Sequence, residues 1–220
     1  MIPDLVIRKA TFQDIDFIIK TIIEAEKSFT NIISYCGIFS LTEEELISLL
    51  EKILSENVTG QELCYSDYLV AVIGGEYAGA CGAWVEGANG FSSAVLKADI
   101  LFGFIPQKKI LNAKHYFPTL QHLNIEREKD TLQIVYAYVI EKFRGKGLVG
   151  KLINEHIRIQ KGLFPQIKKV QLRPTITNES AFKAYNKLGF ELAYEKSTED
   201  VKVLEYLPAR GKYLMEKTLL

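Results

Sequence analysis

The stretch from Phe143 to Ile153, F-R-G-K-G-L-V-G-K-L-I, constrains the fold of this chain most strongly. It follows an apolar run, Leu132 to Ile140, whose β-branched and aromatic residues predict a buried strand. After it, apolar residues recur at helical spacing from Leu148 to Ile157. A strand, a glycine turn and a helix bring free backbone N–H groups and the positive end of a helix dipole to one point, which favours phosphate binding. A plain tight turn is the alternative that this stretch alone leaves open.

The glycines of this stretch do not follow the two best-known nucleotide-binding patterns. Gly145 and Gly147 give G-x-G, but Gly150 comes three places later, where the dinucleotide fingerprint does not have its third glycine. The P-loop pattern is also missing. Glycine has no Cβ, so the backbone here can approach a ligand closely. Arg144 and Lys146 add positive charge.

A second stretch, Asn178 to Phe190, reads N-E-S-A-F-K-A-Y-N-K-L-G-F and follows a strand-like run at Lys168 to Leu172. Together the two stretches resemble the GNAT family of acyl-CoA-dependent N-acetyltransferases. The first is similar to the family's R/Q-x-x-G-x-G/A loop, with Arg144 and Gly147 in place and Val149 where the family usually has Gly or Ala. The second matches N-x-x-A-x-x-x-Y-x-K-L-G-F at every fixed position: Asn178, Ala181, Tyr185, Lys187, Leu188, Gly189 and Phe190.

The resemblance implies a fold and a cosubstrate. The fold is α/β, with a mixed, mostly antiparallel sheet of six to seven strands flanked by helices, in which strands four and five splay apart. The cosubstrate is acetyl-CoA, with its pyrophosphate on the glycine loop and its pantetheine arm along strand four. We expect the Val149 side chain to crowd the pyrophosphate while its N–H stays available. The implied cofactor-binding residues are Val139, Ile140, Arg144, Gly145, Lys146, Gly147, Val149, Gly150 and Asn178.

Tyr185 resembles the family's general acid, which would protonate the departing thiolate. A phenol has a pKa near that of a thiol, so the transfer has no large barrier. The alternative is a core aromatic, because Tyr185 shares helical spacing with Ala181 and Leu188. No base is evident on strand four. Glu86 and Glu141, at neighbouring strand ends, are candidates, and a water chain to solvent is an equal alternative.

Composition excludes several other classes of protein. The chain has 220 residues, with 27 basic and 27 acidic side chains, so no basic field favours nucleic acid or a membrane surface. It has no apolar run of the roughly 20 residues that cross a bilayer and no secretion signal. Three scattered cysteines are typical of reduced thiols, and we expect a cytoplasmic protein. His115 and His122 lack further ligands nearby, so no metal is expected.

The remaining elements follow from periodicity and turn signals, and we interpret residues 1–220 as a single domain. Thr11 and Thr42 begin helices, Gly74 and Gly75 join two strands, and Phe29 to Ser40 is irregular. The further expected strands are Leu5–Arg8, Tyr68–Ile73, Ala78–Val85, Phe190–Glu195, Lys212–Lys217 and a short one at Val201–Leu204.

An insertion at about 87–130 separates strands three and four, where the family has a short turn. Ala94–Phe104 is expected to be helical, and Ile110–Phe117 is expected to form a helix that ends before Pro118. Its apolar content predicts that it folds back on the domain. We expect it to line an acceptor pocket with Phe102, Phe104, Tyr116 and Phe117. Extension of the core or a dimer contact is an equal alternative.

The sequence therefore predicts an acyltransferase that moves an acetyl group from acetyl-CoA to a primary amine by direct attack in a ternary complex. The acceptor, a small amine or a protein amine, stays open, and a homodimer is allowed. A non-catalytic module that senses acyl-CoA is one alternative. A nucleotide-binding protein that shares only the glycine loop is another, and it leaves the second motif unexplained.

Overall fold

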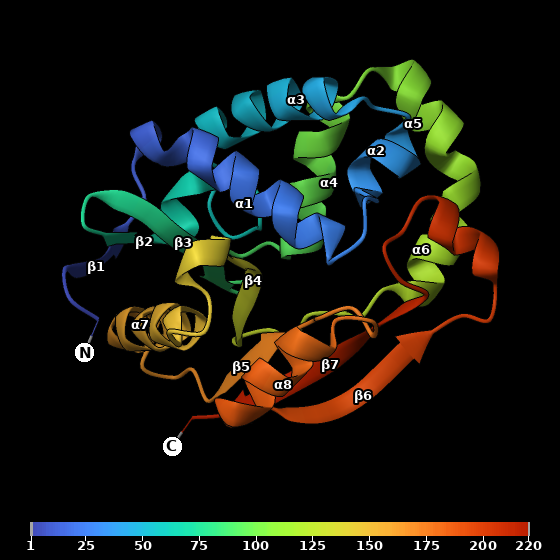
Figure 1. Cartoon of the computed structure of the whole chain (residues 1–220). Helices are drawn as coiled ribbons and strands as arrows, with labels where there is room; N and C mark the ends of the chain where they lie inside the picture. The colour runs from blue at the N-terminus through green and yellow to red at the C-terminus, as the bar shows by residue number, and fades with distance from the viewer. Residues whose placement is uncertain (1, 220) are drawn as a thin grey trace.

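The chain folds around a seven-stranded mixed sheet, and the computed structural model describes residues 2–219 (Figure 1). The strand order is β1-β2-β3-β4-β5-β7-β6, and β4 with β5 is the parallel pair. This confirms the predicted mixed sheet. The strands are β1 (Leu5–Lys9), β2 (Tyr68–Ile73), β3 (Glu76–Val85), β4 (Leu132–Val139), β5 (Lys169–Leu172), β6 (Glu191–Ser197) and β7 (Gly211–Thr218).

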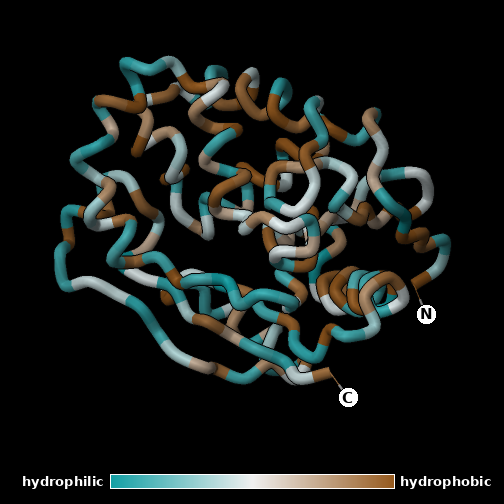
Figure 2. Tube along the Cα trace, turned by 180° about the vertical axis from the view of Figure 1, so that it is seen from behind, coloured by the Kyte–Doolittle hydropathy of each residue, from teal (hydrophilic) through white to brown (hydrophobic). Residues whose placement is uncertain are grey.

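Helices cover both faces of the sheet. On one face α1 (Ile15–Lys27) packs on β3 and β4, with α3 (Glu43–Glu56) and α4 (Ser93–Phe104) behind it. On the other face α7 (Leu148–Leu163) packs on β2, β3 and β4, with α8 (Glu179–Lys187) near it (Figure 1). Figure 2 shows hydrophobic and hydrophilic residues interleaved around α7, as expected for a helix with one face on a sheet.

Local signals set several of the element ends. The Thr42 side chain accepts from the Glu45 N–H and the Glu45 side chain from the Thr42 N–H, which is the predicted capping box of α3. Gly74 and Gly75 have positive φ and join β2 to β3 as predicted. Two expectations are wrong: the segment treated as irregular contains a helix, α2 (Ser34–Phe39), and the expected strand at Val201–Leu204 is a 3-10 helix, Val201–Glu205.

The insertion between β3 and β4 is helical. Its first helix, α4, agrees with the prediction. The predicted end before Pro118 is wrong, because α5 (Gln107–Ala113) is followed by a 3-10 turn and then by α6 (Phe117–Leu123). Pro118 stands in the first turn of α6, where its missing N–H would have had no helical partner anyway.

Strands β4 and β5 diverge after a short paired segment. In the described part of the chain their pairing is confined to Leu132–Ile134 and Val170–Leu172. Beyond Leu172 the chain parts from β4 but stays beside β7, where the Tyr213 N–H donates to the Pro174 carbonyl at 2.9 Å. Strand β4 continues to Val139 without β5 beside it. The predicted splay is therefore confirmed, and it leaves a gap between the two strands.

A β-bulge in β4 accompanies the divergence. Ala80 of β3 faces Tyr138 and Gly82 faces Val135, so Cys81 alone stands opposite two β4 residues, Tyr136 and Ala137. Tyr136 has a φ of +46°, which is uncommon for a non-glycine residue. The bulge interrupts the ladder and bends β4 at the point where β5 leaves it.

None of the helices in residues 2–219 combines the length and the hydropathy that a bilayer-spanning segment needs.

Candidate active site

A cleft of about 910 Å³ opens between the splayed strands. Its walls come from the end of α1, the bulged half of β4, the start of α7, the β5–α8 loop and the start of β7. The insertion and the α3–β2 loop contribute at its inner end. Elements far apart in sequence thus share one space, which is large enough for a cosubstrate and an acceptor.

The N-terminus of α7 borders this cleft. Gly145 and Gly147 have φ of +75° and +70°, and no atom lies within 4 Å of the place a Cβ would occupy at either glycine. The first helical bond joins the Lys151 N–H to the Gly147 carbonyl, and no side chain caps the helix. The N–H groups of residues 148–150 therefore have no helical partner, which is the arrangement that binds phosphate oxygens.

Basic side chains surround this helix start. Arg144 and Lys146 are exposed, and the Arg144 Nε–H donates to the Val139 carbonyl at 3.1 Å. The Val149 side chain lines the cleft. Gly150 has another role: a Cβ there would lie 2.7 Å from the Leu188 side chain, so Gly150 permits the close packing of α7 on the end of α8.

The last residues of β4 turn one backbone edge toward the gap. The Ile140 N–H donates to the Ala78 carbonyl at 2.9 Å, so this N–H is engaged in the sheet. Alternation in an antiparallel ladder then points the N–H and carbonyl of Val139 away from β3. Val139 lines the cleft and Ile140 does not.

Tyr185 lies on α8 and faces the cleft. Its ring packs against Phe190, and its hydroxyl has no hydrogen bond to the described residues. Burial, and to a lesser extent the Cys81 thiol, raise the pKa of Tyr185 above its ordinary value of 10. The phenol therefore keeps its proton through the neutral range.

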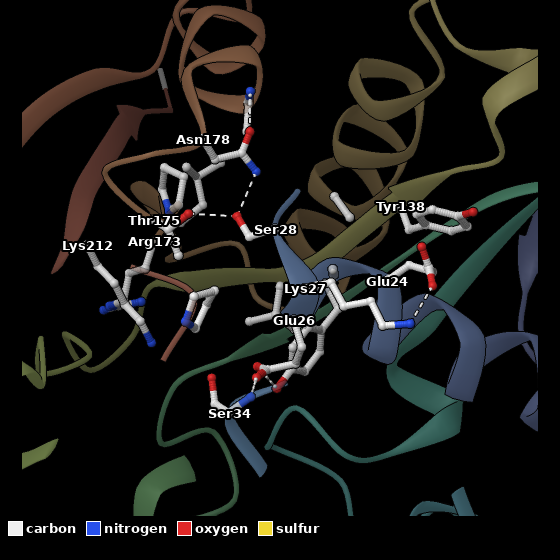
Figure 3. A pocket seen from close by; sticks show the side chains of 18 of the residues that line it. Glu24, Glu26, Lys27, Ser28, Ser34, Tyr138, Arg173, Thr175, Asn178 and Lys212 are labelled. Atoms are coloured by element: carbon white, nitrogen blue, oxygen red, sulfur yellow. Dashed lines mark hydrogen bonds and ion pairs between the residues drawn. The ribbon is translucent and has the colours of Figure 1, made fainter. Parts of the chain in front are cut away.

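Asn178 joins α8 to the end of α1. Its Oδ1 accepts from the Ala181 N–H at 3.0 Å, so it is the cap of α8. Its Nδ2 donates to the Ser28 hydroxyl at 3.2 Å, and Ser28 is 2.7 Å from the Thr175 hydroxyl (Figure 3). The amide is thus engaged with α1, and this link closes one wall of the cleft.

Neither carboxylate expected as a base is placed for that role. Glu86 is buried, accepts from the Trp84 indole N–H at 3.0 Å and the Ser93 N–H at 2.8 Å, and does not line the cleft. Glu141 is exposed and also outside the cleft.

The carboxylate that the sequence reasoning missed is Glu26. It lines the cleft near the end of α1, and its oxygens lie 3.3 Å from the Ser34 N–H and 3.3 Å from the Tyr136 hydroxyl (Figure 3). Tyr136 is the residue at the bulge, so Glu26 lies beside the bent part of β4. In the sequence Glu26 is one polar residue of an amphipathic helix, with no motif to distinguish it.

The insertion reaches the cleft, but with other residues than predicted. Phe102, Phe104, Tyr116 and Phe117 do not line it: Phe102 is exposed and the other three pack against the core on the α1 side. The contributing side chains are Lys97, Leu101, Leu120 and Arg127. Phe104, Tyr116 and Phe117 are kept out of the cleft because their rings pack on the core.

Among residues 2–219, no group of three or more His, Cys, Asp or Glu side chains is arranged to hold a metal ion.

Comparison with protein families gives one match: the model of the acetyltransferase (GNAT) family matches residues 38–190. No curated protein matches the chain.

Solved structures of similar fold include an N-acetyltransferase from Staphylococcus aureus Mu50. It is 19% identical, the match covers 96% of this chain and 100% of that one, and the TM-score is 0.66. A GNAT-family acetyltransferase from Streptococcus pneumoniae is 19% identical over 98% of this chain and 99% of its own, with a TM-score of 0.53. The aminoglycoside acetyltransferase AAC(6')-Ib, in complex with coenzyme A and kanamycin, is 17% identical. The match covers 97% of this chain and 94% of that one, and the TM-score is 0.52. At these identities the likeness concerns the fold.

The bulge that shapes the cleft is supported from behind by His156 of α7. Its Nε2 lies 2.8 Å from the Cys81 carbonyl, which only accepts, so Nε2 carries the proton. His156 is 3% exposed, and burial lowers its pKa from 6.5 to about 4. The neutral ring is therefore the form that the folded chain holds.

We expect the unfolding free energy to fall by about 3 kcal/mol as the pH is lowered from 6.5 to 4, because the unfolded chain protonates His156 in that window and the folded chain does not. Urea unfolding at several pH values measures it. The exchange His156→Gln should flatten this part of the profile, while His122→Gln at an exposed position should not. An unchanged slope in His156→Gln contradicts the assignment.

Proposed function

Because the chain belongs to the acetyltransferase (GNAT) family, we propose that it transfers an acetyl group from acetyl-CoA to a primary amine. The observation that carries this proposal is the junction of three features in one cleft: the uncapped start of α7, the gap between β4 and β5, and the phenol of Tyr185. The aminoglycoside acetyltransferase AAC(6')-Ib, a protein of similar fold, forms a complex with coenzyme A, and this supports the choice of cosubstrate.

The residues present fit coenzyme A. The free N–H groups at residues 148–150, with Arg144 and Lys146 beside them, would hold the pyrophosphate. The Val139 N–H, which points away from β3, would donate to a pantetheine carbonyl as a strand neighbour does. The Val139 carbonyl already accepts from Arg144. When bound, acetyl-CoA supplies the acetyl group as a thioester.

Two proton transfers, one from the amine and one to the thiolate, would accompany the reaction. The amine nitrogen attacks the thioester carbonyl, a C–N bond forms and the C–S bond breaks. Glu26 would take the proton that the amine loses, since its carboxylate lies in the cleft beside the bulge. Tyr185 would give its proton to the departing thiolate, because its phenol lines the cleft and is protonated at neutral pH. A backbone N–H at the bulged half of β4 would stabilise the oxyanion.

The exchange Gly147→Glu should weaken CoA binding by about 10-fold or more, because it adds a carboxylate beside the phosphates and removes a glycine of positive φ. Isothermal titration with CoA measures this. The variant Gly162→Glu adds the same charge at the other end of α7, where nothing lies within 4 Å of a Cβ, and should bind CoA normally. Unchanged affinity in a folded Gly147→Glu protein contradicts the phosphate site.

The exchange Tyr185→Phe should lower kcat roughly 10- to 1,000-fold. It should barely change CoA affinity, because the ring remains. A thiol-release assay over an amine panel provides the rate, and the same assay separates an acetyltransferase from a module that only senses acyl-CoA. Tyr213→Phe, outside the cleft, is the matched control. Equal turnover by Tyr185→Phe and the parent would mean that Tyr185 is a core aromatic and not the general acid.

The exchange Glu26→Gln should lower kcat/KM for amines about 100-fold near neutral pH, because an amide cannot take the proton. Its shape is kept, so the contacts with Ser34 and Tyr136 can persist. Glu24→Gln is the comparison in the same cleft: Glu24 is paired with Lys27 at 3.3 Å and should matter far less. The reverse order of effects would assign the base to Glu24.

A further inference from the structure

The inner end of the cleft collects positive charge. Four basic side chains line it: Lys97 of α4, Arg127 ahead of β4, Arg173 after β5 and Lys212 of β7. They lie far apart in the sequence, so their meeting is a product of the fold. None of them belongs to the glycine loop at the start of α7.

Two of these cations are neutralised by one carboxylate. The Glu62 oxygens lie 2.5 Å from Lys97 Nζ and 2.6 Å from Arg127 Nη2. Burial by itself would raise the pKa of Glu62, but Lys97 and Arg127 hold it at about 2. Glu62 is therefore charged near neutral pH, and each of its oxygens already contacts one cation. Two positive charges already face one negative charge here.

Arg173 is held by neutral acceptors. Its Nη1 donates to the Gln133 side-chain oxygen at 2.5 Å and its Nη2 to the Glu126 carbonyl at 3.0 Å. No described carboxylate pairs with it, and burial, followed by the charge of Arg127, lowers its pKa to about 10. The Nε atoms of Arg173 and Arg127 are also buried without a partner in the described residues. Both Nε atoms are closed off from solvent, so Arg173 contributes positive charge to the cleft and no accessible free donor.

Lys212 is the cation without a partner. Its side chain lines the cleft, and its ammonium makes no hydrogen bond or ion pair with the described residues. Its backbone is fixed by a bridge to Thr175. Lys212 is exposed in the open cleft, so its ammonium is accessible to an anion that a ligand brings in. The nearby carboxylates of Glu26 and Glu62 act on it through space without contacting it.

These groups lie apart from the cosubstrate side of the cleft. Figure 3 shows Lys212 and Arg173 together on the side opposite Tyr138, with Glu26 between the two sides. Phosphates at the start of α7 already have Arg144, Lys146 and the free helix N–H groups. The excess positive charge at the inner end is therefore not needed to hold those phosphates.

We propose that Lys212, assisted by Arg173, binds a carboxylate carried by the acceptor, so that the substrates are amines that also bear a carboxylate, such as amino acids. This rests on the proposed function. The free donors are those of one ammonium group, because the terminal nitrogens of Arg173 are engaged. That matches a singly charged carboxylate better than a phosphate dianion. Leu101, Leu120 and Leu207 on the same walls suit an acceptor with an apolar body.

The test compares two product-like probes that differ only in charge: N-acetyl-L-phenylalanine, which has a carboxylate, and N-acetyl-L-phenylalaninamide, which is neutral. Each is titrated calorimetrically into the 220-residue chain with CoA present. We expect the carboxylate probe to bind about 10- to 100-fold more tightly, the range of a charge-assisted hydrogen bond. In Lys212→Met this ratio should fall below about 3, while affinity for the neutral probe stays the same.

The control is Lys52→Met, an exposed lysine on α3 outside the cleft, which should keep the full ratio. Lys212→Gln is the second variant if the methionine protein does not fold. Equal binding of the two probes by the parent, no binding of either, or an unchanged ratio in the Lys212 variants overturns the proposal.

A separate assay keeps this proposal distinct from the proposed function. Thiol release from acetyl-CoA is measured with L-phenylalanine and with phenylethylamine as acceptors. If the probes bind as expected and neither amine is acetylated, nor any other in the panel, the carboxylate site stands and the acetyltransferase activity fails. If phenylethylamine is acetylated at least as efficiently as L-phenylalanine, the activity stands and the carboxylate site is overturned.

Discussion

The bulge at Tyr136 is the constraint on which the rest of the cleft depends. A continuous ladder would carry β4 straight along β5 and leave no room between them. The extra residue in β4 bends the strand instead, and the departure of the chain at Pro174 removes its neighbour. The positive φ of Tyr136 is uncommon, so surrounding contacts must hold it. The Tyr136 hydroxyl reaches Tyr35 and Glu26 on one face, and His156 holds the Cys81 carbonyl on the other.

The cleft has two positively charged regions with different physical origins. At the start of α7 much of the field comes from backbone N–H groups and a helix dipole, which attract any phosphate-like anion. At the inner end it comes from side chains whose charges exceed those of the nearby carboxylates. Glu26 lies between these regions. In such an arrangement the amine of an acceptor would lie near Glu26, and an anion attached to it would lie at the basic inner end. The acetyl donor would occupy the gap between the strands.

The insertion changes the acceptor side and leaves the sheet intact. Its helices pack on the core through their apolar faces, and Lys97 and Arg127 are the charged side chains it adds at the cleft. Both are paired with Glu62, which comes from the loop ahead of β2. The insertion is thus tied to the body of the domain by an ion-pair network in which the buried carboxylate is satisfied. A change in this segment would alter the inner end of the cleft without moving α7.

The sequence by itself determined the features whose causes are local. The capping box at Thr42, the hairpin at Gly74 and Gly75, and the start of α7 each depend on residues within a few positions of one another. The spaced motif ending at Phe190 singled out Asn178 and Tyr185 in the same way. Asn178 is the N-cap of α8, and Tyr185 lies within that helix. The splay of β4 and β5 was available only through the resemblance that these motifs carry.

Only the tertiary structure decided which charges meet. Glu26, Lys97, Arg173 and Lys212 lie on separate elements, and none is part of a recognisable pattern. The aromatic residues of the insertion were the more obvious choice for a pocket lining. Three of them, Phe104, Tyr116 and Phe117, pack on the core, because burial of large apolar side chains stabilises the fold. The fourth, Phe102, is exposed outside the cleft. Local spacing specifies helices, strands and turns, whereas the composition of a cleft depends on how distant segments pack, and that depends on the whole chain at once.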